Sequence, residues 1–414
     1  MDHARGDNMK WKQFILSAAI LLGTSACGLP KEPLKYTVKL DIITQHWDGT
    51  FNWSQTRVGA IPKAGKNGNP AIIMTMQKWF VAHSDYYSGL YTMRSDDMGA
   101  TWTGPAEQPE LGWRDMGKNI VAGICDFVPG WHAPTGKLLA LGHTVYYVKG
   151  GKLLQNRPRS TAYAVYDPNS KKWTPWQELE MPDKTKFFNS GSGCAQWLVK
   201  SDGTLLIPAY FKAKEDTTNC YSSTVLHCAF DGTTLTYLEH GDELKWSEPR
   251  GVYEPSLTFY HGKYYLTLRN DKKAYVTVSD NAMHWQPIKP WTFDDGTELG
   301  SYNTQQHWVT HSEGLFLVYT RKGANNDHIP RNRAPLFMAR INTDSLFVLK
   351  NTEKIIIPER GAMMGNFGAT AINENETWVT VGENMYPKEN LNRGANGSVF
   401  AARILWSKKN RILF

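Results

Sequence analysis

Residues 263–269 read KYYLTLR, and residues 315–321 read LFLVYTR. Four more windows have the same form: 71–77 (AIIMTMQ), 137–143 (KLLALGH), 204–210 (TLLIPAY) and 377–383 (TWVTVGE). Each is a short apolar run, rich in β-forming residues, that ends on a polar or charged residue. Most follow a turn signal such as His261-Gly262, so each predicts a buried strand entered from a hairpin. Six copies at intervals of roughly 50–70 residues indicate a repeated β unit, which is typical of propeller blades.

The repeat predicts one all-β domain, a single β-propeller over residues 36–414. Six full repeats are recognised, at about 55–105, 120–176, 190–240, 252–291, 303–350 and 365–406. The residues before 55, together with the last strand at 398–406, leave a seventh blade open. Residues 36–43 (YTVKLDII) predict a strand that closes the ring by pairing with the blade at the other end of the chain, which removes an exposed sheet edge.

Residues 95–102 (SDDMGATW) match the pattern S-x-D-x-G-x-T-W, the Asp box of sialidase-like propellers. The pattern predicts a turn between the outer strands of a blade. Its Asp accepts hydrogen bonds from nearby backbone, its Gly permits the tight turn and its Trp packs between sheets. Residues 279–285 (SDNAMHW) resemble a copy that is one residue short, and residues 166–173 (YDPNSKKW) are expected to play a similar role. The motif indicates the fold and carries no catalytic group.

Composition narrows the function classes. The 414 residues are 41% hydrophobic and 12% aromatic, which excludes disorder, and the formal net charge of +7 is compatible with an anionic substrate. No dense Lys/Arg run and no nucleic-acid motif occurs, so nucleic acid is not expected as a partner.

The first 27 residues read as an export signal. A basic start at Met9-Lys10 precedes an apolar run from Phe14 to Leu22, and small residues then lead to Cys27. This resembles a lipoprotein signal in which Cys27 is acylated, with residues 28–35 as a tether. The protein is therefore expected in a bacterial cell envelope, as a periplasmic or outer-membrane lipoprotein held to the membrane through Cys27, or as a secreted protein. In such a protein Cys220 and Cys228 are candidates for a disulfide across a hairpin, and Cys125 and Cys194 for buried thiols.

Equivalent positions in blades lie on one face around one axis, so the six strand ends are expected to form a ring: Gln77, His143, Tyr210, Arg269, Arg321 and Glu383. His and Tyr can transfer protons, and two Arg can hold a carboxylate through forked hydrogen bonds. Further substrate-binding candidates come from strand ends and from the long polar loop 321–333: His132, Glu254, Gln306, His307, Asn325, His328, Arg331, Arg333 and Asn366. Each residue alone has a structural explanation, but six polar ends together indicate a pocket.

The ring suits elimination better than hydrolysis. Glycoside hydrolysis usually needs two carboxyl groups flanking the bond, and the ring holds only Glu383, with Glu254 and Asp271 as partners. Elimination from a uronate needs a cation on the carboxylate, a base for the C5 proton and an acid for the leaving oxygen. His143, Tyr210, Arg269 and Arg321 can supply these roles.

Residues 125–147, 250–271, 294–341 and 359–368 resemble sialidase-like propeller proteins of Bacteroidetes, nearest to glycoside hydrolase family 145 and polysaccharide lyase family 42. The resemblance covers about residues 45–406. It implies a seven-bladed propeller that acts on L-rhamnose α-1,4-linked to D-glucuronate, a cap on plant arabinogalactan. It also implies a His/Tyr/Arg lyase site, matched by His143 and Tyr210. The related lyases carry an Arg on the strand after the Tyr. That strand, YSSTVLHC here, has none, so Arg269 or Arg321 would replace it.

Three alternatives stay open beside the lyase. The hydrolase family relies on a His on the opposite face. His46 is the one candidate for that role here, and with Gln45 it makes up the alternative hydrolase site. A non-catalytic glycan-binding lipoprotein and an exo-sialidase are the others. A monomer is expected, no metal or cofactor is assigned, and a structural calcium ion is compatible with the pattern.

Overall fold

The computed structural model describes residues 34–83, 85–154, 157–386 and 392–412. The described residues form strands, turns and four single-turn 3₁₀ helices: η1 (Lys66–Gly68), η2 (Pro109–Leu111), η3 (Pro330–Asn332) and η4 (Lys350–Thr352). None of these helices has the length and apolar character of a membrane span. The predicted export signal, its Cys27 and most of the tether lie outside the described residues.

The first half of the chain builds three consecutive antiparallel sheets. The first sheet contains β2 (Phe51–Ile61), β3 (Ala71–Phe80), β4 (Tyr87–Ser95) and β5 (Thr103–Glu107). The second contains β6 (Arg114–Gly117), β7 (Ile120–His132), β8 (Lys137–Val148), β9 (Lys152–Leu153), β10 (Thr161–Asp167), β11 (Lys172–Trp173) and β12 (Gln177–Glu178). The third contains β13 (Asn189–Gly191), β14 (Leu198–Val199), β15 (Leu205–Lys212), β16 (Cys220–Phe230) and β17 (Leu235–His240), with β18 (Arg250–Gly251) joined in parallel to β16.

The second half builds three more. The fourth sheet contains β19 (Tyr253–Tyr260), β20 (Lys263–Arg269), β21 (Tyr275–Ser279) and β22 (Lys289–Pro290). The fifth contains β23 (His307–His311), β24 (Gly314–Tyr319), β25 (Leu336–Asn342), β26 (Phe347–Val348) and β27 (Lys354–Ile357). The sixth contains β28 (Gly368–Asn373), β29 (Glu376–Gly382), β30 (Ser398–Trp406) and β1 (Tyr36–Gln45).

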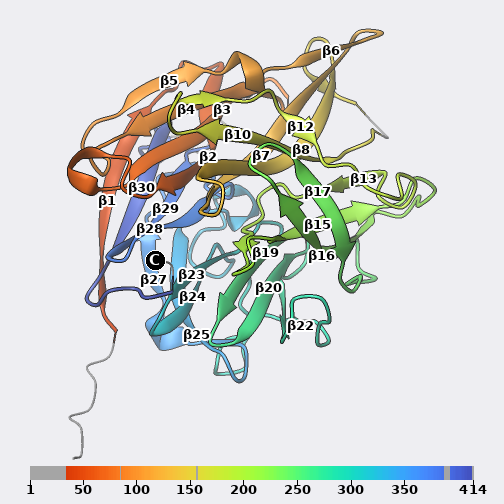
Figure 1. The fold of residues 1–414 in the computed structure, drawn as a ribbon. Helices are drawn as coiled ribbons and strands as arrows, with labels where there is room; N and C mark the ends of the chain where they lie inside the picture. The colour runs from red at the N-terminus through yellow and green to blue at the C-terminus, as the bar shows by residue number, and fades with distance from the viewer. Residues whose placement is uncertain (1–33, 84, 155–156, 387–391, 413–414) are drawn as a thin grey trace, which may run out of the picture. The chain divides into compact units, whose positions relative to one another are not determined.

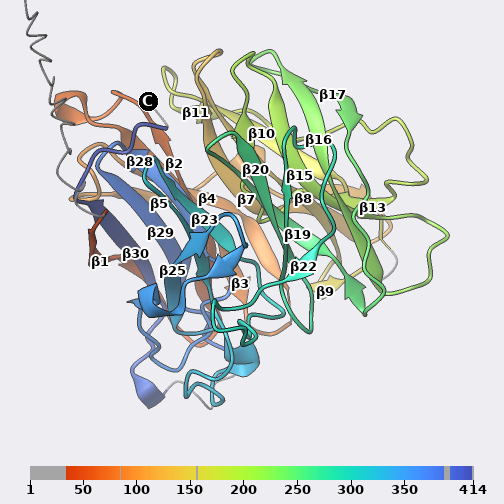
Figure 2. The ribbon, with the colours of Figure 1, turned by 90° about the horizontal axis from the view of Figure 1, so that it is seen from below.

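These sheets follow one another as blades of a propeller, as Figure 1 shows. The opening strands of neighbouring blades contact each other around most of the ring: β2 with β7, β19 with β23, β23 with β28, and β28 of the last blade with β2 of the first. The third blade contacts its neighbours through β13 against β8 and β15 against β19. The N-terminal strand β1 closes the ring by pairing along β30, from Tyr36 opposite Trp406 to Gln45 opposite Ser398. Figures 1 and 2 both place β1, at the red end of the colour scale, beside blue β30. The predicted closure is confirmed. The described residues form six sheets, without the seventh blade that the resemblance implied.

All six apolar windows fall on the second strand of a blade: β3, β8, β15, β20, β24 and β29. These strands are buried on both faces between neighbouring sheets, which explains their unbroken apolar runs. Leu139 and Leu141 of β8, for example, share one core cluster with Leu205 and Ile207 of β15. Each fully buried Leu or Ile contributes about 1.5–3 kcal/mol to folding, so the interfaces between blades form the main core.

The Asp box forms the predicted turn between the outer strands β4 and β5. The carboxylate of Asp97 accepts hydrogen bonds from the backbone N–H of Thr101 (2.8 Å), the Thr101 hydroxyl (2.6 Å) and the Ser95 hydroxyl (3.0 Å). These bonds hold the pKa of Asp97 well below its usual range. Asn281 accepts equivalent backbone bonds in the shorter copy between β21 and β22.

We predict that Gly99→Ala destabilises the propeller more than Gly262→Ala does. Both glycines have φ of +81°, where a side chain is strained by about 1–2 kcal/mol. A Cβ on Gly99 would also meet Trp378 Cη2 at 2.8 Å, whereas a Cβ on Gly262 meets nothing within 4 Å. Urea unfolding of both variants distinguishes the cost of the contact with Trp378 from the cost of the backbone strain. Equal losses of unfolding free energy would show that a Cβ at position 99 does not clash with Trp378.

The predicted disulfide between Cys220 and Cys228 is wrong. Both residues lie on the single strand β16, and an extended strand separates their Cα atoms by roughly 26 Å. Cys125, Cys194, Cys220 and Cys228 are all free thiols, and the two that were expected to be buried, Cys125 and Cys194, are buried.

Candidate functional site

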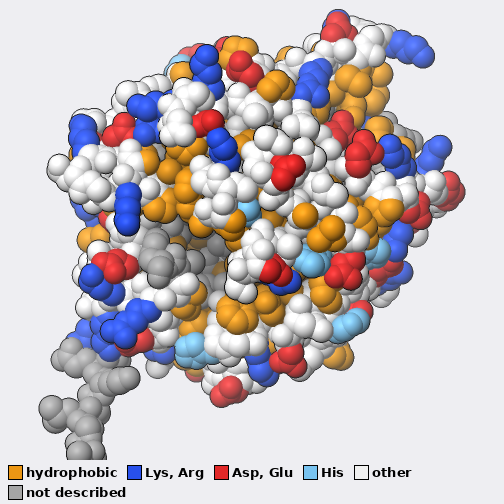
Figure 3. Space-filling view, in the orientation of Figure 1, with side chains coloured by type: hydrophobic (Ala, Val, Ile, Leu, Met, Phe, Trp, Pro, Cys, Tyr) orange, Lys and Arg blue, Asp and Glu red, His pale blue; other side chains and the backbone are white. Residues whose placement is uncertain are grey.

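One cavity of about 750 Å³ is lined by residues from all six blades or their connecting loops. Its charged lining is dominated by six arginines, so we call it the arginine cavity: Arg157, Arg159, Arg250, Arg269, Arg331 and Arg333. Four carboxylates and two histidines also line it: Asp85, Asp126, Glu254, Asp271, His83 and His143. On the face of the molecule shown in Figure 3, by contrast, Lys and Arg side chains are interspersed with Asp and Glu. The cavity therefore concentrates positive charge, whereas this face of the molecule mixes both signs.

The innermost part of each of the first five blades contributes one residue with left-handed backbone to this cavity. They are Gln55 (φ 56°), Asp126 (59°), Cys194 (64°), Glu254 (44°) and Asn303 (49°). At Gln55, Asp126 and Glu254 the ladder to the second strand also shifts register, as in a β-bulge. Bulges redirect side chains and are common beside active sites, and left-handed non-glycine residues concentrate at such sites. This ring of five is the structural centre of the candidate site.

A buried arginine, Arg57, lies behind one half of the ring. Its side chain is 1% exposed. Its guanidinium donates to Gln55 Oε1 (2.6 Å), Asp126 Oδ1 (3.2 Å) and Cys194 Sγ (3.2 Å). Burial raises the pKa of Asp126, and the charge of Arg57 opposes that rise. Arg57 thus ties three neighbouring blades together beneath the cavity.

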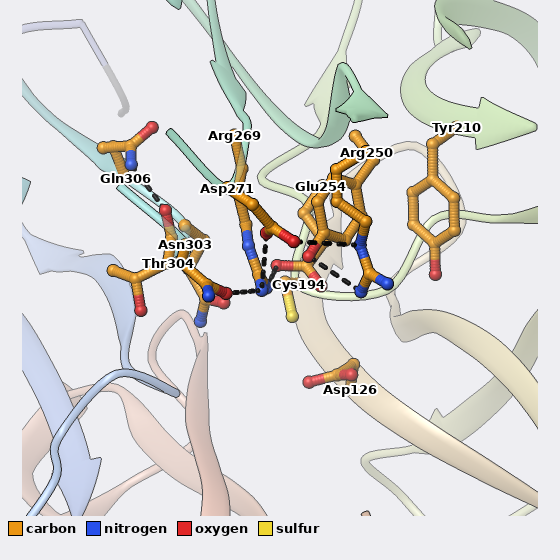
Figure 4. Close-up of polar contacts among 12 residues, drawn as sticks. Asp126, Cys194, Tyr210, Arg250, Glu254, Arg269, Asp271, Asn303, Thr304 and Gln306 are labelled. Carbon is orange, nitrogen blue, oxygen red and sulfur yellow. Dashed lines mark hydrogen bonds and ion pairs between the residues drawn. The ribbon is translucent and has the colours of Figure 1, made fainter. Parts of the chain in front are cut away.

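Arg269 holds the other half of the ring, as Figure 4 shows. It donates to Glu254 Oε2 at 2.5 Å and to Asn303 Oδ1 at 2.8 Å. Burial disfavours the charged guanidinium, but Glu254 outweighs this and raises the pKa of Arg269. Arg269 and Arg250 also lie over the ring of Tyr253, at 4.5 and 4.6 Å from its centroid.

His143, Tyr210 and Arg159 form a compact polar cluster at the wall of the cavity. The Tyr210 hydroxyl lies 3.3 Å from His143 Nδ1 and accepts a hydrogen bond from Arg159 Nη1 at 3.0 Å. Burial, with the nearby charges of Arg159 and Arg157, lowers the pKa of His143 well below 6.5. Burial raises the pKa of Tyr210, against the pull of Arg159. At neutral pH His143 is therefore a neutral acceptor, and Tyr210 keeps its proton.

Glycine lets the chain pass close to this cluster. A Cβ on Gly193 would lie 2.1 Å from His143 Nδ1, and a Cβ on Gly191 would lie 2.7 Å from His143 Cβ. The segment Gly191–Gly193 therefore fixes the position of the imidazole from one side.

The cationic side of the cavity is crowded enough to favour a bound anion. Burial lowers the pKa of Arg333 to about 10, and the neighbouring charges of Arg269 and Arg331 add to the effect. A carboxylate placed between these arginines would relieve their repulsion and accept charge-assisted hydrogen bonds.

The sixth, first and second blades contribute an apolar part of the cavity lining, in contrast to the cationic side. Apolar or aromatic side chains gather there: Trp79, Val145, Leu153, Met363 and Tyr386. Trp79 and Tyr386 make an edge-to-face contact at 6.0 Å. A ligand with an anionic part and an apolar part therefore fits the cavity better than a uniformly charged one.

The structure brings together about half of the predicted site residues. His143, Tyr210 and Arg269 of the predicted ring line the arginine cavity, together with the predicted binding residues Glu254, Arg331, Arg333 and Asn366. The arginine that donates to the Tyr210 hydroxyl is Arg159.

The other three members of the predicted ring do not line the cavity. Arg321 forms a two-bond pair with Glu353, at 2.8 and 2.7 Å. Glu383 is buried in a two-bond pair with Arg360, both bonds 2.9 Å. Gln77 donates to the backbone carbonyls of Ser88 and Ile124 inside the core. The six apolar windows form the second strand of each blade, not the innermost one. Their last residues therefore reach the cavity only where the innermost strand leaves space for a side chain.

Five further predicted binding residues do not line the cavity, and four of them have structural partners elsewhere. Gln306 is buried and bonded to Thr267 and Ser301, while His307 is buried against Ser256 at 2.7 Å, and burial lowers the pKa of His307 to about 3. The remaining three lie away from the cavity lining: His132 bonded to Thr135 and Gly203 at the far end of β7, His328 paired with Glu359, and Asn325 exposed.

The alternative hydrolase residues also lie outside the cavity lining. Gln45 is exposed at the end of β1. His46 stacks on Phe51 with ring centroids 3.9 Å apart, and its Nε2 lies 3.3 Å from Asp48 Oδ2. These contacts are those of a packed surface histidine.

Sequence reasoning missed most of the polar residues that organise the cavity: Arg57, Asp126, Arg157, Arg159, Cys194, Arg250 and Asn303. One signal was available, since Arg157-Pro158-Arg159 places two arginines in a connection between blades. In the described residues no group of three His, Cys, Asp or Glu side chains is placed to hold a metal ion.

Several sialidases are among the solved structures that share this arrangement. A Hadza microbial sialidase superposes with a TM-score of 0.57 at 12% identity, over 86% of this chain and 66% of that protein. NanB sialidase from Streptococcus pneumoniae gives 0.57 at 12% identity over 89% of this chain and 70% of that protein. Trypanosoma rangeli sialidase gives 0.52 at 12% identity over 90% and 58%.

The chain has the sialidase-like β-propeller fold. At 12% identity the likeness shows the fold alone, and the chain spans only 58–70% of the length of these three sialidases. No protein-family model and no curated protein sequence matches the chain.

Proposed function

We propose that this propeller is a carbohydrate-active lyase that removes terminal L-rhamnose from α-1,4-linked D-glucuronate by β-elimination. The observation that carries the proposal is the cluster of neutral His143, protonated Tyr210 and cationic Arg159 in a cavity lined by six arginines. The rhamnose–glucuronate linkage itself comes from the family resemblance of the sequence.

Each step of an elimination has a candidate group in the cavity. The crowded guanidiniums of Arg333, Arg269 and Arg331 bind the uronate carboxylate and make its C5 proton more acidic. Neutral His143 accepts that proton, and its electron pair forms the C4–C5 double bond as the C4–O4 bond breaks. The Tyr210 hydroxyl gives its proton to O4, which leaves as the rhamnose hydroxyl. Arg159, 3.0 Å from the Tyr210 oxygen, stabilises the tyrosinate that results.

The apolar lining supports a deoxysugar as the leaving group. Rhamnose carries a methyl group where most hexoses carry a hydroxymethyl, and the side chains of Trp79, Val145 and Met363 can cover such a group.

The test is incubation with a rhamnosyl-glucuronate glycan, reading both free rhamnose and the ultraviolet absorbance of an unsaturated uronate. The proposal expects both signals in equal amounts. Rhamnose without absorbance would mean hydrolysis, and binding without release would mean a glycan-binding protein; either result would overturn the lyase.

An exo-sialidase is the second candidate, favoured by one observation. Asp126 faces the cavity with a raised pKa, as a general acid in hydrolysis requires, and Glu254 supplies a second carboxylate. Release of a fluorophore from a sialoside, lost in Asp126→Asn, would establish this activity in place of the lyase.

We predict that kcat/KM for rhamnose release falls on acidification only below the ordinary histidine pKa of about 6.5. The base must be neutral, and the depressed pKa of His143 keeps it neutral down to lower pH. A pH–rate profile on the glucuronate substrate measures this directly. An acidic limb at or above the ordinary value would show that His143 is not the base.

A further inference from the structure

A second cavity, of about 610 Å³, adjoins the arginine cavity on the third blade. The ends of β15 and β16 form it, together with the loops 213–219 and 243–247. Tyr221 lines both cavities. Three lysines line the second cavity, so we call it the lysine cavity: Lys186, Lys212 and Lys245.

Aromatic rings run from one cavity into the other. Tyr210 contacts Tyr221 edge-on at 5.7 Å, and Tyr221 stacks on Tyr253 at 5.8 Å with 27° between the rings. The lysine cavity adds Phe211 and the half-buried Trp246. Aromatic faces of this kind pack against the C–H faces of sugar rings, so this lining suits a carbohydrate.

The lysine cavity has positive charge in excess of its own carboxylates. Lys186 and Lys245 both pair with Glu243, so one carboxylate serves two lysines. Lys212 donates to the Thr218 carbonyl at 2.8 Å and lies 5.8 Å from the Tyr221 ring, with no carboxylate partner in the described part of the chain. The second carboxylate, Asp216, accepts bonds from Thr218. An incoming carboxylate therefore finds unmatched cations beside an aromatic wall.

We propose that the lysine cavity binds a second acidic sugar of the same glycan chain, on the reducing-end side of the glucuronate in the arginine cavity. This rests on the proposed function for the arginine cavity. The chain then crosses Tyr221 between the two sites. Longer acidic chains bind more tightly than short ones, while the chemical step stays the same, because Lys212 and Trp246 do not contact the reacting atoms.

The experiment measures binding of β-1,4-linked glucuronate dimer and tetramer to the full chain carrying His143→Gln, by calorimetry. We expect the tetramer to bind about tenfold more tightly than the dimer, the gain of about 1.4 kcal/mol that one extra charged subsite can supply. Lys212→Met and Trp246→Ala, each added to that chain, should bring the two affinities together. In the otherwise unchanged enzyme they should raise KM for long substrates at constant kcat.

Two matched controls test whether the gain depends on the carboxylates of the ligand and on the position of the lysine. Cellotetraose has the same backbone without carboxylates and should show no tetramer gain. Lys200→Met removes a half-buried lysine of the same blade, which pairs with Asp202 before the start of β15, and should leave the gain intact. Equal affinities for dimer and tetramer, or a gain unaffected by Lys212→Met, would overturn the proposal. If the tetramer binds through Lys212 but rhamnosyl-glucuronate is not cleaved, the lysine cavity is supported as a binding site. Only the proposed lyase activity is then contradicted.

Discussion

His143→Gln is expected to reduce kcat for rhamnose release by about 10²–10⁴-fold, the contribution typical of a positioned general base. Neutral His143 is 3.3 Å from the Tyr210 hydroxyl and has its pKa depressed by burial and by Arg159 and Arg157. Glutamine fills a similar volume and can accept a hydrogen bond from Tyr210, but it cannot take up the C5 proton. Single-turnover kinetics on the glucuronate substrate measures the chemical step without product release.

His46→Gln is the matched control. His46 packs on Phe51 outside the cavity lining, so full activity is expected. A dead His46 variant beside an active His143 variant would move the chemistry to the other site and favour hydrolysis. Tyr210→Phe should resemble His143→Gln, because the acid and the base act in the same elimination.

The sequence predicts the fold well because its clearest signal comes from the most buried strands. Second strands such as β8 and β20 are covered on both faces, so their composition is dictated by burial alone. The predicted limits of the six blades lie within a few residues of the observed strands, with two exceptions. The second blade includes β6, which begins at Arg114, and the fifth includes β27, which extends to Ile357.

The sequence analysis placed the candidate site at the ends of the second strands. The cavity is centred one strand closer to the axis, at the innermost strands. The residues that centre the cavity are left-handed positions on the innermost strands or in the connections beside them, three of them at bulges. Residue types such as Glu254 and Cys194 carry no local signal for left-handed backbone. Their partners are distant in the chain: Arg57 reaches Asp126 across 69 residues and Cys194 across 137. Contacts of this range follow from the closed ring, which no short pattern reveals.

A ring of left-handed residues costs stability, since each such position is strained by about 1–3 kcal/mol. The strain persists because buried charge-assisted hydrogen bonds hold the ring in place. Arg57 serves one half and Arg269 the other, so the groups that preorganise the cavity also stabilise the propeller.

Arg57→Met is therefore expected to destabilise folding by about 3–5 kcal/mol, the usual effect of removing one partner of a buried ion pair. The loss leaves the Asp126 carboxylate without its cation and frees Gln55 and Cys194 from their shared donor. Urea unfolding at neutral pH measures the change.

The double variant Arg57→Met/Asp126→Asn separates charge from packing. Asparagine removes the unpaired charge, so a substantial part of the lost stability should return. Lowering the pH should also restore part of the stability of the Arg57→Met single variant. Asp126 has a raised pKa, and its protonated form needs no cation. The stability deficit relative to the unmodified protein is thus expected to shrink as the pH falls. A deficit that is independent of pH and unchanged by Asp126→Asn would mean that Arg57 stabilises the blades by packing alone, and that the left-handed ring is held by other contacts.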